Sequence, residues 1–198
     1  LVIMLDAILF SFALAYQYRT IQEVKVRAEA IARIDPLTGL NNRRAFYEVS
    51  KPYWNATVRK NRDASVILLD VDHFKRINDT YGHDKGDRVL VAIAVVLAQS
   101  ARESDVVARW GGEEFILFLP ETSRAEAALT AERLRVAIAQ ASVEMTNESI
   151  SFTASFGVAQ RSVTTTTIDD LIAQADKLLY FAKSTGRNKV SASTNWNE

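Results

Sequence analysis

The sequence predicts a mixed α/β or α+β domain built around a central sheet, preceded by a long helix. Apolar runs of strand length alternate with segments whose apolar residues recur at helical spacing. Two of the predicted strands are separated by a turn containing Gly111 and Gly112, which favours an antiparallel hairpin within a mixed sheet. The chain has 198 residues, 48% of them hydrophobic, enough for one globular domain and an appendage.

Residues 1–33 are predicted to form one helix, for which two interpretations stay open. Residues 1–18 carry a single charge, Asp6, and basic residues follow from Arg19 onward, as at the cytoplasmic end of a membrane helix. The apolar run is somewhat shorter than the about 20 residues of a full span. Apolar residues also lie seven apart, as at Leu14 and Ile21, which is typical of a soluble two-stranded coil.

A new domain is predicted over residues 34–192, followed by a tail over 193–198. Asp35-Pro36 ends the first helix, because the residue before a proline is pushed out of the helical region. Apolar spacing and turn residues then predict the following elements. They are a helix over 42–61 interrupted near Pro52, a buried central strand over 64–72, a helix over 84–100, a hairpin of strands 106–109 and 114–119, a helix over 123–141, a strand over 150–159, and a helix over 168–183 with Gly186 as its C-cap.

The composition excludes several classes of function. Lys and Arg together number 24, as do Asp and Glu, so a protein-wide basic field is absent and no DNA or RNA partner is expected. The chain has no cysteine, which excludes disulfides, Cys-ligated zinc and a thiol nucleophile. Any phosphate chemistry must therefore rely on local side chains or on metal ions.

The predicted central strand ends in two carboxylates, Asp70 and Asp72. Carboxylates at the end of a buried strand suit a hard cation such as Mg²⁺, which is commonly held by one or two carboxylates together with substrate phosphates. The same two residues could instead cap the turn that follows the strand.

A second acidic cluster, Glu113-Glu114, follows the two glycines of the hairpin. Adjacent residues of a strand point to opposite faces, so only one of these acids is expected to share the face of Asp70. A Gly-Gly hairpin followed by glutamates is common, and on its own it indicates only exposed polar side chains. Two acidic clusters on neighbouring strands, however, are typical of two-metal phosphoryl transfer.

These segments resemble the GGDEF domains of diguanylate cyclases. Gly-Gly-Glu-Glu-Phe at 111–115 is similar to the family signature, and the segments 35–44, 70–87 and 183–188 resemble three further motifs in the same order. The resemblance covers residues 34–192. It implies a palm-like fold with a mainly antiparallel five-stranded sheet flanked by helices. It also implies that two GTP are condensed into cyclic di-(3′→5′)-GMP and two pyrophosphates across a homodimer, at the cytoplasmic face of a bacterial inner membrane.

The resemblance also implies the catalytic and metal-binding residues. Two Mg²⁺ or Mn²⁺ ions per active site would be held by Asp70, the carbonyl of Val71, Glu113 and Glu114. Glu113 could in addition help to deprotonate the attacking 3′-hydroxyl, although a metal-lowered hydroxyl pKa could suffice without a protein base. Lys75 would assist catalysis by binding phosphate.

Further positions are similar to the family's substrate-binding residues. A carboxylate that accepts hydrogen bonds from guanine N1–H and the 2-amino group would reject adenine, which lacks both donors there. On their own, Lys183 and Arg187 would be explained as basic residues at the C-terminus of the last helix, where positive charge interacts favourably with the helix macrodipole. His83 is interpreted mainly as packing behind the site. The substrate-binding residues implied are Phe74, Lys75, Asn78, His83, Asp87, Lys183 and Arg187.

Arg102-Glu103-Ser104-Asp105 resembles the family's RxxD site, at which cyclic di-GMP inhibits its own synthesis. Arginine can bond the O6/N7 edge of guanine and stack on its face. Arg133 is expected to contribute to the same site. The alternative is a solvated ion pair between Arg102 and Asp105. Arg133 by itself would be an ordinary exposed arginine on a helix, which indicates no function.

Two other functions remain open at this stage. A catalytically silent domain could bind GTP or cyclic di-GMP as a receptor, and loss of an acid from either cluster would favour it. The domain could also be a dimerisation relay for the first helix, which would leave two carboxylate clusters without a purpose.

Overall fold

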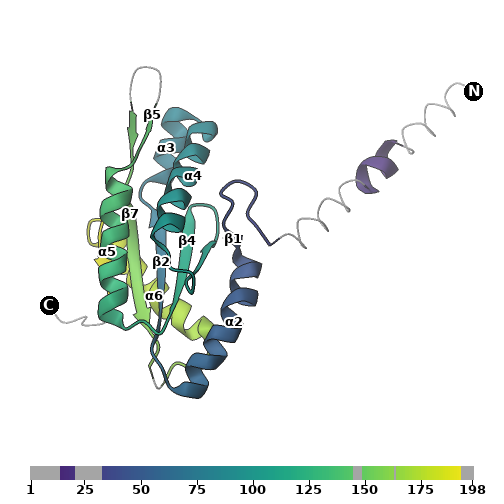
Figure 1. Ribbon diagram of the computed structural model, residues 1–198. Coiled ribbons are helices and arrows are strands. Elements are labelled where there is room, and N and C mark those ends of the chain that lie inside the picture. The colour runs from purple at the N-terminus through teal and green to yellow at the C-terminus, as the bar shows by residue number, and fades with distance from the viewer. Residues whose placement is uncertain (1–13, 21–32, 145–148, 163, 193–198) are drawn as a thin grey trace, which may run out of the picture. The chain divides into compact units, whose positions relative to one another are not determined.

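The computed structural model describes residues 14–20, 33–144, 149–162 and 164–192 (Figure 1). The chain divides into two units, Leu1–Arg33 and Ile34–Glu198. Residues 14–20 are helical and exposed. The rest of the helix predicted over 1–33 and the tail 193–198 lie outside the described residues. Within the described ranges, no helix combines the length and the apolar character that a membrane span needs.

The second unit contains a mixed sheet with strand order β1-β3-β4-β2-β7-β8 (Figure 1). The central strand β2 pairs antiparallel with β4 and β7, β3 pairs antiparallel with β4, and the short edge strands β1 and β8 pair in parallel. The prediction of a mainly antiparallel sheet is confirmed, but the described sheet has six strands rather than five. The bounds are β1 Asn41–Asn42, β2 Ala64–Val71, β3 Val106–Arg109, β4 Glu114–Pro120, β7 Ala154–Gln160 and β8 Val190–Ser191.

Helices cover both faces of this sheet, and each face has its own apolar core. Helices α4 and α5 pack on one face and α2 and α6 on the other, so both sides of β2 are buried. Strands covered on both faces have continuous apolar sequences, as β2 does. A separate two-stranded sheet joins β5 to β6. The remaining bounds are α2 Arg43–Lys60, α3 Phe74–Tyr81, α4 His83–Ser100, β5 Ser142–Glu144, β6 Ser149–Ser151, α5 Arg124–Gln140 and α6 Ile168–Ser184.

Helix α2 corrects one prediction, because it runs through Pro52 without interruption. A proline in a helix removes one hydrogen bond, the one to the carbonyl four residues earlier. Pro52 and Glu48 are both exposed, so water can satisfy the carbonyl of Glu48. Asn42 caps the start of the helix, since its side chain accepts a hydrogen bond from the backbone N–H of Ala45 at 3.0 Å.

The hairpin between β3 and β4 differs from the expected tight turn between two glycines. Arg109 pairs with Phe115, and the backbone N–H of Trp110 donates to the carbonyl of Glu114 at 2.8 Å. This register leaves Gly111, Gly112 and Glu113 in the turn. Neither glycine has a positive φ. Glu113 therefore lies in the turn and Glu114 begins β4.

The strand predicted over 150–159 is divided into β6 and β7, which belong to different sheets. Strand β7 contains Gly157, at which a Cβ atom would come within 2.0 Å of the carbonyl oxygen of Ala175. The glycine thus allows the backbone of α6 to pack directly against the sheet. This close contact helps to set the position of α6, whose last turn carries Lys183 beside the end of β2.

Candidate active site

The carboxylate of Asp70 is the centre of the site. Asp70 lies near the end of β2, is 6% exposed, and is paired directly with Glu114 of β4. Paired residues of antiparallel strands share a face. Glu114 is therefore the acid on the face of Asp70. Glu113 is joined to β2 through its backbone, because its carbonyl accepts a hydrogen bond from the N–H of Val71 at 3.2 Å.

Lys183 of α6 provides the positive charge at this point. Its Nζ lies 2.7 Å from Oδ2 of Asp70. Burial raises the pKa of Asp70 to about 6; the hydrogen bond and charge of Lys183 oppose the rise, and the charges of Glu113 and Glu114 add to it. Two glutamates and one lysine thus act electrostatically on the carboxylate of Asp70.

This donor set fits a hard divalent cation, because all the side-chain donors are carboxylate oxygens and the mutual repulsion of the acids would be offset by the cation. In the described ranges, however, no three acidic or imidazole side chains converge closely enough to form a ready metal site. Asp70 is engaged by Lys183 instead. A bound cation would therefore compete with Lys183 for Asp70.

Asn78 of α3 lies against α4 and presents a polar atom without a partner. Its Oδ1 is buried and accepts no hydrogen bond within the described part of the chain. Buried oxygens are nearly always hydrogen-bonded, so this one is suited to an external donor. Gly86 and the half-buried Phe74 lie beside it. Asp87 follows Gly86 on α4 and is exposed.

The other predicted substrate residues lie at the ends of helices. Lys75 is exposed at the start of α3, and His83 is exposed as the first residue of α4, so the interpretation of His83 as a packed residue is not supported. Arg187 follows α6 in a loop in which Gly186, Arg187 and Asn188 all have positive φ values, 118°, 60° and 44°.

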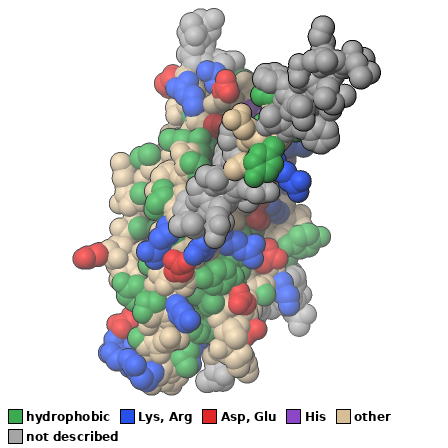
Figure 2. Space-filling model, turned by 90° about the vertical axis from the view of Figure 1, so that its right-hand side faces the viewer, with side chains coloured by type: hydrophobic (Ala, Val, Ile, Leu, Met, Phe, Trp, Pro, Cys, Tyr) green, Lys and Arg blue, Asp and Glu red, His purple; other side chains and the backbone are tan. Residues whose placement is uncertain are grey.

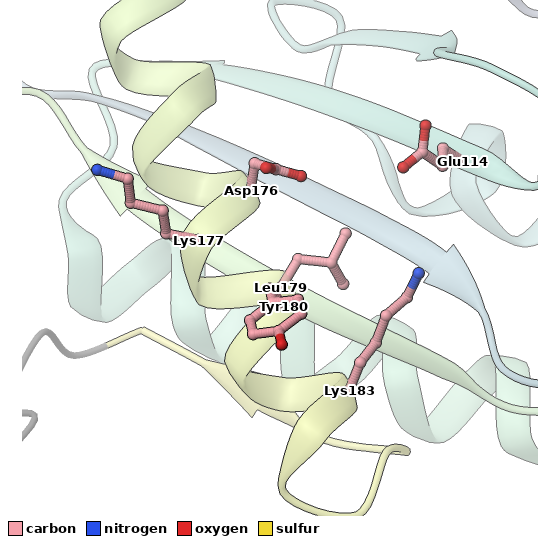
Figure 3. A pocket seen from close by; sticks show the side chains of 6 residues that line it. All are labelled: Glu114, Asp176, Lys177, Leu179, Tyr180 and Lys183. Carbon is pink, nitrogen blue, oxygen red and sulfur yellow. The ribbon is translucent and has the colours of Figure 1, made fainter.

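A pocket of about 340 Å³ opens between β4 and α6, next to Asp70 (Figure 3). Lys183 and Glu114 belong to it, and Tyr180, which is 71% exposed, lies on its wall. The other lining residues belong to none of the motifs recognised in the sequence. The signal that could have found them is an aromatic residue in the last two turns of a helix, three residues before a predicted phosphate-binding lysine. The lining residues are Glu114, Asp176, Lys177, Leu179, Tyr180 and Lys183.

Arg109 connects the hairpin to the start of the domain, a link that no sequence motif predicted. Its Nε and Nη2 donate to the carbonyl of Gly112 at 3.1 and 2.8 Å, and its Nη1 lies 3.2 Å from Oδ1 of Asp35. Burial raises the pKa of Asp35, but hydrogen bonds from Thr38 and the charge of Arg109 together hold it below its usual range. The peptide that precedes Glu113 is therefore fixed by a half-buried ion pair.

The structure brings the three predicted RxxD residues to one small pocket. Arg102, Asp105 and Arg133 all line it. The backbone N–H of Arg102 donates to Oδ2 of Asp105 at 2.9 Å. Asp105 therefore binds the backbone of Arg102, and the side chain of Arg102 stays exposed. Burial raises the pKa of Asp105, and Arg102 opposes the rise.

The face shown in Figure 2 carries Lys and Arg side chains interspersed with Asp and Glu. A phosphate ligand of this domain would therefore be held by local cations, such as Lys183. Fold and site together define a mixed α+β domain with an acidic site at the end of its central strand.

Comparisons with known proteins identify the family. The model of the diguanylate cyclase GGDEF domain matches residues 32–189. Diguanylate cyclase DgcM of Escherichia coli K12 is 43% identical over 171 residues, which are 86% of this chain and 41% of that protein. The chain belongs to the GGDEF diguanylate cyclase family, and it spans less than half the length of the curated relatives it matches.

Solved structures support the fold. The GGDEF domain of DgcB from Caulobacter crescentus in complex with cyclic di-GMP has a TM-score of 0.78 and 34% identity, over 82% of this chain and 94% of that one. Diguanylate cyclase SiaD of Pseudomonas aeruginosa, in complex with its activator SiaC, has a TM-score of 0.76 and 36% identity, over 94% and 72% of the two chains. The predicted α+β fold of the family is confirmed.

Proposed function

We propose that this chain is an active diguanylate cyclase, which condenses two GTP into cyclic di-(3′→5′)-GMP with release of two pyrophosphates. The observation that carries the proposal is the complete acidic set around Asp70. Asp70, Glu113 and Glu114 interact electrostatically across the β2–β4 pairing, with Lys183 within 2.7 Å of Asp70. A domain that had lost catalysis would not need to maintain this repulsive arrangement.

Guanine would be bound at the α3–α4 end of the site. The buried Oδ1 of Asn78 would accept a hydrogen bond from the base, and Asp87 would accept from N1–H and the 2-amino group. Adenine offers neither donor at that edge, so it would leave Oδ1 of Asn78 unpaired. Phe74 would pack beside the base, and His83 lies at the exposed entrance.

Asp70, the Val71 carbonyl, Glu113 and Glu114 would hold the two Mg²⁺ or Mn²⁺ ions. When bound, these ions stabilise charge on the attacking and leaving oxygens. Lys183 would move from Asp70 to the phosphates, and Lys75 and Arg187 would bind phosphate oxygens as fixed cations. Glu113 would accept the proton of the 3′-hydroxyl if the hydroxyl does not lose it directly to water.

The reaction would take place across a homodimer, because each domain binds one GTP and each 3′-hydroxyl must attack the other nucleotide. Cyclic di-GMP would inhibit the enzyme at the pocket of Arg102, Asp105 and Arg133. This part of the proposal is supported by the convergence of the three side chains on one pocket. Replacing Arg102 with Ala should weaken product inhibition, and unchanged inhibition would contradict it.

We also propose that residues 1–33 place the domain at the cytoplasmic face of a bacterial inner membrane and set the geometry of the dimer. The support is the apolar sequence of residues 1–18 and the basic residues that follow it. Fractionation of cells that produce the whole chain and a variant beginning at Ile34 tests this: recovery of both in the soluble fraction would contradict membrane attachment.

The activity is tested by incubating nucleotide-free protein with GTP and Mg²⁺ or Mn²⁺ and identifying products by mass spectrometry. Cyclic di-GMP from the wild type, but not from Glu113→Gln, is the expected result. If a demonstrably dimeric protein binds GTP or cyclic di-GMP and forms no product, the receptor function replaces this proposal.

A further inference from the structure

The carboxylate of Asp72 is buried directly after β2, and both of its oxygens accept hydrogen bonds. Asp72 is 5% exposed. Its Oδ1 accepts from the hydroxyl of Ser155 at 2.6 Å, and its Oδ2 accepts from the hydroxyl of Thr153 at 2.7 Å and from the backbone N–H of Asn188 at 2.9 Å. Asp72 therefore neither caps the turn after β2 nor has a free oxygen for a metal ion.

The third of these hydrogen bonds holds a strained loop. Gly186, Arg187 and Asn188 have positive φ values in succession. A residue other than glycine in this region costs on the order of 1–3 kcal/mol and persists only where the surroundings impose it. Such strain commonly occurs at functional sites, and this loop carries Arg187.

Two further contacts define where the loop lies. The backbone N–H of Arg187 donates to the carbonyl of Ala182 at 3.0 Å, and the side chain of Asn188 accepts from Nη1 of Arg135 at 2.8 Å. Asp72 differs from these partners in one respect: it directly follows β2, two residues after Asp70. Its bond to Asn188 ties the loop to the strand that carries the central acid of the site.

We propose that Asp72 is a positioning residue, which fixes the loop after α6 so that Arg187 stays at a constant place relative to Asp70. The inference rests on the proposed function, because it takes Arg187 as a ligand of the GTP phosphates. Asp72 would not touch the substrate. It would act through the backbone of Asn188.

The charge of Asp72 makes the proposal sharply testable. Asp72→Ala removes a negative charge close to a highly anionic ligand, so through-space electrostatics alone would make GTP bind more tightly. Positioning predicts the opposite, because alanine offers no oxygen to the N–H of Asn188, whereas asparagine could turn its amide oxygen toward that N–H and donate its NH2 to the hydroxyl of Ser155. The sign of the change in affinity separates the two effects.

The experiment measures binding of GTP and of guanosine, each with Mg²⁺, by titration calorimetry. For Asp72→Ala we expect GTP affinity to fall at least about tenfold, with guanosine affinity within about twofold of wild type. Unchanged or tighter GTP binding, or an equal loss for both ligands, would overturn the proposal. Failure of the wild type to bind GTP would instead contradict the proposed function.

A second pair of variants keeps the test available if Asp72→Ala does not fold. Arg135→Ala removes the other side-chain contact to Asn188 and should weaken GTP binding by a smaller factor, with guanosine binding unchanged. Glu132→Gln is the matched control, because Glu132 pairs with Arg135 without contacting the loop. Equal effects of Arg135→Ala and Glu132→Gln on GTP affinity would contradict the positioning of the loop.

Discussion

Gly86 lies directly against the side-chain amide of Asn78. A Cβ atom at residue 86 would come within 1.8 Å of Oδ1 and 3.0 Å of Cγ of Asn78. The close approach of α3 and α4 at this point therefore depends on a missing side chain. It also holds the unpartnered Oδ1 of Asn78 in place.

Gly86→Ala should displace the amide of Asn78 and weaken binding of guanine nucleotides by about 10- to 100-fold, the cost of one lost buried hydrogen bond. Calorimetric titration with GTP measures the loss. The same substitution in an Asn78→Ala background should cost less stability than in the wild type, because the overlapping atoms are gone. Equal costs in both backgrounds would show that the contact is unimportant.

Gly157→Ala should destabilise the whole domain rather than the site. The added Cβ would meet backbone atoms, the Ala175 carbonyl at 2.0 Å and the Leu179 nitrogen at 2.3 Å, which cannot rotate away. We expect a loss of about 3 kcal/mol or more in the free energy of unfolding. Gly112→Ala is the control, since nothing lies within 4 Å of its Cβ position. Urea unfolding of the two variants gives the comparison, and similar midpoints would refute the expected clash.

The raised pKa of Asp70 predicts an inverse dependence of stability on pH in metal-free protein. The unfolded chain releases this proton near 3.8 and the folded chain near 6, so the folded state binds more protons between these values. The stabilisation that Asp70 contributes to the free energy of unfolding is present in full below pH 3.8 and is lost as the pH rises through about 6. A shift of this size corresponds to about 3 kcal/mol.

Denaturant unfolding of metal-free wild type and Asp70→Asn between pH 4 and pH 7 isolates this effect from the other acids. Stability of the wild type relative to Asp70→Asn should fall with rising pH. Mg²⁺ should stabilise the wild type only above about pH 6, where it does not have to displace a proton. Parallel profiles of the two proteins would contradict the assigned pKa.

Long segments of regular apolar spacing were predictable from the sequence, and short or polar ones were not. Helix α5 has the expected extent because its apolar spacing is regular and Ser123 supplies a capping box. Helix α3 was missed, since Ile77 is its only buried residue. Strands β1 and β8 have two residues each, and only their tertiary pairing defines them.

The acids of the site were predictable in type but not in role. The residues that bind the side chain of Asp72 lie 81, 83 and 116 positions away in the sequence, so spacing along the chain gives no indication of them. The expected alternation of the two adjacent acids along one strand does not apply, because Glu113 lies in the turn before β4. The hairpin register then decided that Glu114, rather than Glu113, is paired with Asp70.

Arg109 should couple the stability of the hairpin to catalysis. Its guanidinium bridges the Gly112 carbonyl and Asp35, and the side chains of Arg109 and Asp35 are each 17% exposed. Arg109→Ala removes two donors from the peptide before Glu113 and leaves Asp35 without its cation. We expect a loss of about 1–3 kcal/mol in stability, and a fall in kcat larger than any rise in KM for GTP, because Glu113 is less well oriented while guanine binding is unaffected.

Arg109→Lys should recover only part of this loss, because a single ammonium group cannot reproduce the planar fork that reaches both partners. Arg44→Ala is the matched control: Arg44 pairs with Glu48 on the exposed surface of α2, where such pairs contribute about 0.2–1 kcal/mol. Urea unfolding and steady-state kinetics on the three variants provide the measurements. If Arg109→Ala costs no more than Arg44→Ala, or if KM rises while kcat is unchanged, the ion pair does not orient Glu113.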